Sequence, residues 1–134
     1  MAAAHFLKPL LSSSPDGYIL TNTRDGAPFA TTLETAFDSD SRRRGLLGRD
    51  GLADGAAMII APCQAIHTFA MKFPIDVVFV TGEGEVVKLR ERMPAGRMAG
   101  AWTAFAVIEL AAGAIARAGL EAGDRLALVP RVTQ

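Results

Sequence analysis

Turn-forming residues recur about every ten positions along this 134-residue chain, and this spacing limits the fold more than any other feature. They are Pro15-Asp16-Gly17, Asp25-Gly26, Gly48 to Gly51, Pro62, Gly82-Glu83-Gly84, Pro94 with Gly96, and Gly123-Asp124. The intervals are too short for most helices. They hold apolar or β-branched runs at 18–21, 29–35, 57–60, 75–80, 85–91, 104–110 and 125–129. We therefore predict a mainly β, single-domain antiparallel sandwich or barrel-like fold (jelly-roll type) over residues 1–134.

Two segments favour short helices instead of strands. In 38–47, Asp38 or Ser39 is a suitable N-cap, and Gly48 is a natural stop. Residues 111–118 are rich in alanine and are followed by Gly119, which suits a left-handed C-terminal position. Both helices are so short that they need tertiary packing for stability.

Composition narrows the classes of function. Lys plus Arg and Asp plus Glu both number 14, and this balance argues against a protein that coats nucleic acid. The single cysteine, Cys63, excludes an intramolecular disulfide and a cysteine-only metal site. We see no signal peptide and no apolar run long enough for a membrane span, so we expect a cytoplasmic protein. No sequence motif indicates a cofactor or a metal.

Two carboxylates interrupt apolar strands. Residues 75–80 and 104–110 are apolar on both alternating faces, which is typical of central strands, yet they contain Asp76 and Glu109. A buried ionised carboxylate is costly unless it is hydrogen-bonded or paired. Either the two acids form a ligand or catalytic site with His67 or an arginine, or they are structural. In the structural case Asp76 caps a loop and Glu109 pairs with a surface arginine.

Cys63 and His67 lie four residues apart, a spacing that raises the question of a nucleophile and its base. In an extended strand that spacing separates them by about 13 Å, beyond hydrogen-bond reach. We favour a small buried thiol. A metal site built from Cys63, His67, Asp76 and Glu109 is conceivable, but no ligand motif supports it.

Two further clusters admit a structural and a functional interpretation. Arg42, Arg43, Arg44 and Arg49 could bind an anion, but the neighbouring Asp38, Asp40, Asp50 and Asp54 favour a solvated helix face. If the strand pattern continues, His67, Phe69, Met71 and Phe73 share one side. That side is either an apolar sheet face with one histidine or the wall of a ligand pocket in which His67 orients the ligand.

Several of these runs together resemble the domain of unknown function 192 family. They are Arg42 to Arg49, Ala56 to Ile60, Ile66 to Phe79, Val86-Val87, Pro94, Val107 to Leu110, Gly113 and Gly123-Asp124. The resemblance spans 31–129 and leaves 1–16 as an N-terminal extension. It implies a small sandwich or jelly-roll domain with a few short helices, often exported in relatives, and without an established activity. Where relatives often have Trp-Met-Lys-Asn-Thr, this chain has Ala70 to Pro74, which brings in His67 as a local substitute.

Our leading hypothesis is a binding module for a small polar or anionic ligand or a partner segment. The expected site residues are His67, Met71, Lys72, Asp76, Glu109 and Arg49. One alternative is a small hydrolase that uses Cys63 with His67, or His67 with Asp76. The other is a structural or assembly module that acts through a sheet edge. The sequence leaves the ligand and the oligomeric state open.

Overall fold

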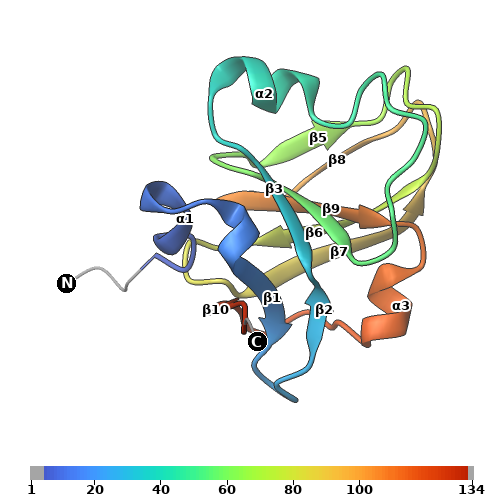
Figure 1. Cartoon of the computed structure of the whole chain (residues 1–134). Coiled ribbons are helices and arrows are strands. Elements are labelled where there is room, and N and C mark those ends of the chain that lie inside the picture. The colour runs from blue at the N-terminus through green and yellow to red at the C-terminus, as the bar shows by residue number, and fades with distance from the viewer. Residues whose placement is uncertain (1–4, 133–134) are drawn as a thin grey trace.

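The protein is built on three β-sheets in residues 5–132, the part that the computed structural model describes. The five-stranded sheet has the order β3 (Thr32–Ala36), β4 (Ala56–Ile60), β9 (Ala106–Ala111), β6 (Ile75–Val80), β7 (Val86–Met93). A three-stranded sheet has the order β10 (Leu126–Pro130), β1 (Tyr18–Asn22), β2 (Pro28–Ala30). β5 (Ala65–His67) pairs with β8 (Met98–Gly100). Figure 1 shows the five-stranded sheet between the other two. The mainly β prediction is confirmed, and the described strands form no closed barrel.

The two predicted helices form, with shifted boundaries. α2 (Ser39–Arg44) has Asp38 as its N-cap, one of the two predicted candidates, in a capping box with Ser41. The helix ends at Gly45 (φ 47°) and not at Leu47. α3 (Ala114–Ala118) ends at left-handed Gly119, as predicted. It begins later than predicted, because residue 111 belongs to β9.

The N-terminal region adds α1 (Pro9–Ser12) and a 3₁₀ turn, η1 (Pro15–Gly17), neither of which was predicted. Leu7 and Leu10 of this region are buried in the hydrophobic core. Of the predicted extension, residues 1–4 lie outside the described part. None of the described helices is long and apolar enough to cross a membrane.

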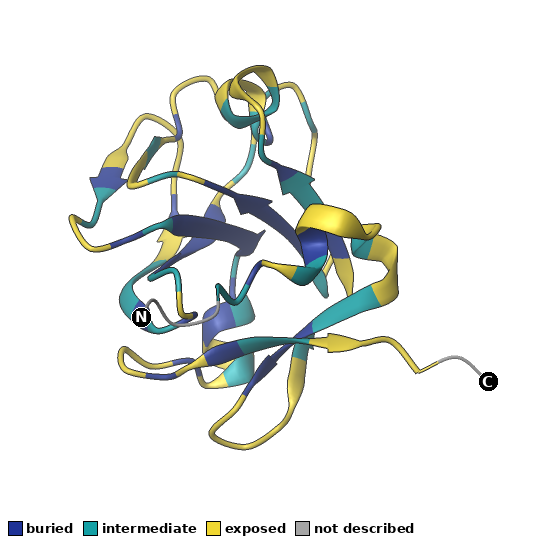
Figure 2. Ribbon diagram, turned by 90° about the vertical axis from the view of Figure 1, so that its left-hand side faces the viewer, coloured by how far each residue is buried: buried dark blue, intermediate teal, exposed yellow. Residues whose placement is uncertain are grey.

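β6 and β9 are central, as their apolar character predicts: all six residues of each are buried, and both lie inside the sheet order. Figure 2 shows buried strands through the middle of the molecule and exposed residues mainly in loops and helices. One core cluster packs between the five-stranded and three-stranded sheets and includes Leu20 and Val78. The other covers the opposite face and includes Leu46, Val77 and Phe79. The five-stranded sheet is therefore covered on both faces.

One strand pair departs from the predicted antiparallel arrangement. β3 and β4 are parallel, with Thr32 opposite Ala56. Parallel neighbours need a crossover connection, and here the chain from residue 37 to 55, which includes α2, supplies it. This crossover brings α2 over one face of the five-stranded sheet (Figure 1).

The predicted continuous strand face through residue 73 is wrong beyond His67, because the chain turns at Thr68. The buried Thr68 hydroxyl donates to the Pro94 carbonyl (2.6 Å) and accepts the Arg97 N–H (3.0 Å). Ala70 then has a left-handed conformation (φ 63°), which a strand cannot contain. The short β5–β8 pair, which was not predicted, ends at this turn.

Candidate functional site

Strand register places the two buried acids on opposite faces of the five-stranded sheet. In the β6–β9 pair, Val77 lies opposite Glu109, and Asp76 lies opposite Leu110. Residues directly opposite one another in a sheet point to the same face. Val77 belongs to the core cluster near α2, whereas Leu110 belongs to the other cluster. Asp76 and Glu109 therefore point away from each other and share no pocket.

Asp76 is completely buried and bonded to the backbone on both oxygens. Its Oδ1 accepts the Arg92 N–H and its Oδ2 accepts the Ile115 N–H, both at 2.8 Å. Ile115 lies in the first turn of α3, where Gly113 has no side chain to act as a cap, so Asp76 takes that role. Arg92 has a left-handed conformation (φ 49°), and its N–H is held by the same carboxylate. These bonds fasten β7 and α3 to β6, which supports the structural interpretation of Asp76.

Glu109 has the opposite environment. It is 5% exposed, and its Oε1 is buried with no hydrogen-bond partner among the described residues. Loss of solvation raises the pKa of Glu109 to about 7, opposed in part by the positive charge of Arg49. At neutral pH the protonated and ionised forms of this carboxyl are therefore both populated.

Arg49, whose positive charge acts on Glu109, is bound to a different carboxylate. Arg49 makes a two-pronged ion pair with Glu34 of β3, with N–O distances of 2.7 and 2.9 Å. This pair lowers the pKa of Glu34 through the Arg49 hydrogen bond. The structural alternative for Glu109, a pair with a surface arginine, does not form among the described residues, and Arg49 pairs with the carboxylate of β3 instead.

A small cavity of about 190 Å³ lies at Glu109, between the end of α2 and β5. Its walls are largely apolar and include Leu46, Ile60 and Met71. Gly45 leaves room beside the carboxyl because it has no side chain: a Cβ there would lie 3.5 Å from Glu109 Oε1. The cavity therefore combines apolar walls with one unpartnered carboxyl, the combination found in small-molecule sites.

Three arginines and a histidine form the polar part of the cavity wall. Arg42 donates to the Pro62 carbonyl (2.9 Å), and Arg43 lies 3.5 Å from Asp40. Within residues 5–132, Arg44 makes no ion pair. His67 Nδ1 accepts the Phe69 N–H (3.3 Å), and the two rings stack 5.0 Å apart. Glu109 is the one acid among the described residues that line the cavity.

The structure thus brings together half of the predicted site residues. His67, Met71 and Glu109 line the cavity, whereas Arg49, Lys72 and Asp76 do not. Lys72 extends to the exposed Asp50 (3.4 Å). Sequence reasoning did not place Gly45 and Leu46 in the site. A glycine inside the predicted helix is the signal that could have indicated the end of the helix and a close approach of its backbone to another residue.

Cys63 also lines the cavity but shows no sign of activation. Burial raises the pKa of its thiol, and its Sγ lies 3.1 Å from the Ala65 carbonyl, to which it donates. A nucleophilic cysteine needs a lowered pKa. His67 has no help from Asp76, whose two oxygens are bound to backbone on the other face. Among the described residues, no three His, Cys, Asp or Glu side chains gather as a metal site.

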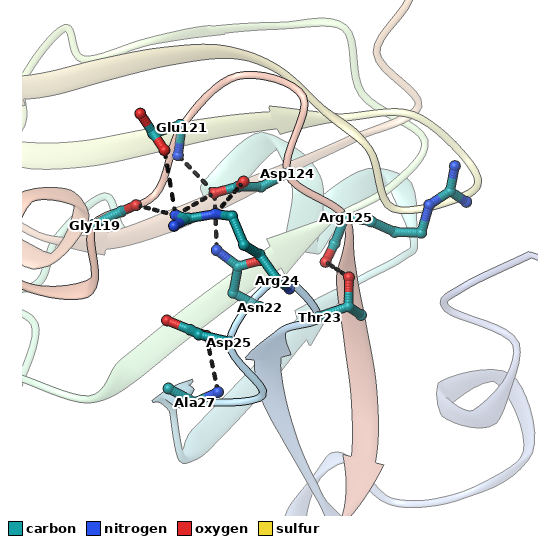
Figure 3. A network of polar contacts seen from close by, with 9 residues as sticks. All are labelled: Asn22, Thr23, Arg24, Asp25, Ala27, Gly119, Glu121, Asp124 and Arg125. Atoms are coloured by element: carbon teal, nitrogen blue, oxygen red, sulfur yellow. Dashed lines mark hydrogen bonds and ion pairs between the residues drawn. The ribbon is translucent and has the colours of Figure 1, made fainter.

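A third acid, Asp124, forms a polar network outside the Glu109 cavity (Figure 3). Its carboxylate accepts from Asn22 Nδ2, Arg24 Nε and the Glu121 N–H, each at 2.8 Å. The Arg24 hydrogen bond is the main reason that the pKa of Asp124 falls to about 2. The network ties the turn after β1 to the turn before β10. Both carboxylate oxygens of Asp124 are therefore hydrogen-bonded, which supports a structural role for this residue.

Comparison with known proteins identifies the family. A protein of unknown function from Novosphingobium aromaticivorans DSM 12444 has a similar structure, with a TM-score of 0.70, 25% identity and 82% of each chain covered. A proposed transcription regulator from Sinorhizobium meliloti 1021 has a TM-score of 0.73 and 24% identity over 83% of this chain and 91% of its own, which is a likeness of fold. No curated protein matches this chain in sequence. The profile of the DUF192 family, described as "Uncharacterized ACR", matches residues 20–128, and the chain therefore belongs to that family.

Proposed function

We propose that this protein is a binding module that holds the polar or anionic group of a small ligand in the Glu109 cavity. The observation that carries the proposal is the unpartnered carboxyl oxygen of Glu109, buried beside that cavity. A buried polar atom without a partner is destabilising, and such atoms concentrate at functional sites. A ligand with a complementary polar group would satisfy it.

The other two buried acids of this fold support the assignment by contrast. Asp76 has two backbone partners, and Asp124 has an arginine, an amide and a backbone N–H. Both of these acids therefore have hydrogen-bond partners within the fold. Glu109 is the exception, and it lines a cavity.

A thermal-shift screen of the full chain against metals, nucleotides, sugars and organic acids tests this function. A ligand at a hundred times its Kd stabilises the folded state by about 2.7 kcal/mol, enough to raise the Tm by several degrees. Glu109→Leu, which replaces the carboxyl with an apolar group of similar size, should abolish the rise in Tm. Glu83→Gln removes an exposed acid outside the cavity and should keep it.

Two results would overturn the proposal. In the first, no compound in the screen raises the Tm of the wild-type protein. In the second, a compound raises the Tm of Glu109→Leu as much as that of the wild type, which places its site elsewhere.

A further inference from the structure

The charges around the Glu109 cavity select the kind of ligand. Arg42, Arg43 and Arg44 line it, and Glu109 is the one acid among the described lining residues. The charged lining residues therefore carry a net positive charge, which disfavours an incoming cation and favours an anion. An anion can then contact Glu109 only if that carboxyl carries a proton and donates it in a hydrogen bond.

The environment of Glu109 favours that protonated form. The side chain is 5% exposed, and Oε1 has no donor within reach among the described residues. Arg49, the cation whose charge acts on Glu109, is held by Glu34. A buried carboxyl without donors prefers to hold its proton. It is then a hydrogen-bond donor aimed at the ligand, next to walls that suit a short hydrocarbon chain.

We propose, resting on the function above, that the ligand is a small aliphatic carboxylic acid, bound as its carboxylate through a hydrogen bond donated by protonated Glu109. One proton is taken up from solvent for each ligand bound when Glu109 is initially ionised. No covalent bond changes. The cavity of about 190 Å³ is small, which suits a ligand of a few carbon atoms.

Other titratable or charged groups also surround Glu109. From the α2 side these are Arg42, Arg43, Arg44 and Arg49, which stay charged at all relevant pH values. Cys63 lies in the loop before β5, and His67 lies on β5. The test therefore includes a variant of His67 as well as a variant of Glu109.

The test is an NMR titration of the full chain, followed through methionine methyl signals. The Met71 methyl group reports on the cavity, and the exposed Met98 is an internal control. The probes are propionate, propylamine as a cation of similar size, and inorganic phosphate. Each is titrated at pH 5.5 and 8.5, where propionate stays ionised.

Propionate should shift the Met71 signal and bind wild type about 30-fold more tightly at pH 5.5 than at pH 8.5, because Glu109 must be protonated. Glu109→Gln should bind propionate with little pH dependence, since an amide is a permanent donor. His67→Asn should keep most of the wild-type ratio. Propylamine and phosphate should leave Met71 unchanged.

The inference is overturned if propionate does not shift Met71, or binds more tightly at pH 8.5. It is also overturned if the pH dependence vanishes in His67→Asn and persists in Glu109→Gln. Binding of phosphate or propylamine, lost in Glu109→Leu, would contradict the carboxylate assignment while leaving the binding function intact. If none of the three probes binds but a compound of the thermal-shift screen does, the carboxylate assignment falls and the binding function stands. If no compound of either experiment binds, both proposals fall.

Discussion

Asp76 and Glu109 occupy equivalent places in the sequence pattern but opposite ones in the structure. Each interrupts an apolar central strand, and they lie on neighbouring strands within one residue of the same register. Asp76 accepts two backbone N–H groups, whereas Glu109 Oε1 has no partner and faces a cavity. The difference teaches that burial of an acid does not indicate its role; the donors that surround it do.

The largest expected effect concerns Asp76. Asp76→Ala removes both acceptors of two short hydrogen bonds, each worth about 1.5–3 kcal/mol when a charged group takes part. The free energy of unfolding, measured in urea, should fall by about 3 kcal/mol or more. Asp76→Asn should lose less, because its amide oxygen can still accept one bond. A loss below about 1 kcal/mol for the alanine variant would contradict the structural role.

Glu109 should make stability depend on pH in the direction opposite to that of a paired acid. Because its folded pKa is raised from 4.5 to about 7, the folded state binds more protons than the unfolded state between these values. Stability contributed by Glu109 is then complete below pH 4.5 and declines as the pH rises to 7, by up to about 3 kcal/mol. Urea unfolding of wild type and Glu109→Gln should diverge over that range. A difference between them that stays constant with pH would refute an unpartnered Glu109.

Asp124 provides the paired counterpart. Its pKa is lowered to about 2, so its contribution is present above pH 4 and is lost as the pH falls from 4 to 2. Asp124→Asn should reduce stability at pH 7 by about 1–2 kcal/mol, since the partner Arg24 is half-exposed and screened. Acid unfolding curves of the two proteins should converge near pH 2. If the two curves stay parallel over that range, the Arg24–Asp124 pair is not the cause of the loss of stability in acid.

The smallest effect concerns Arg49. Its pair with Glu34 is partly exposed, so Arg49→Gln should reduce stability by less than about 1 kcal/mol. Because the Arg49 charge opposes the effect of burial on Glu109, its removal should raise the pKa of Glu109 further. Comparison of the Glu109 titration in the two proteins measures this effect, and a lowered pKa would be inconsistent with it.

Sequence alone could identify Asp76 and Glu109 as acids in central strands, because the alternation of side chains between the two faces of a strand can be followed from consecutive residues. It could not show that they face apart, since that depends on the register in which Val77 meets Glu109. Nor could it show that Glu34 binds Arg49, a contact made by the packing of β3 near the segment after α2. The β5–β8 pair was missed because each strand has three residues, and the turn at Thr68 depends on bonds to residues almost thirty positions away.

The central claim, that Glu109 is a buried carboxyl without a partner, can be measured directly. A carbon-13 NMR titration of the side-chain carboxyl groups, with the Glu109 signal assigned from its loss in Glu109→Gln, gives its pKa in the intact chain. We predict a value of about 7, raised by burial. A value near the ordinary 4.5 would contradict the account, because it would show that Glu109 is solvated or paired in the folded protein.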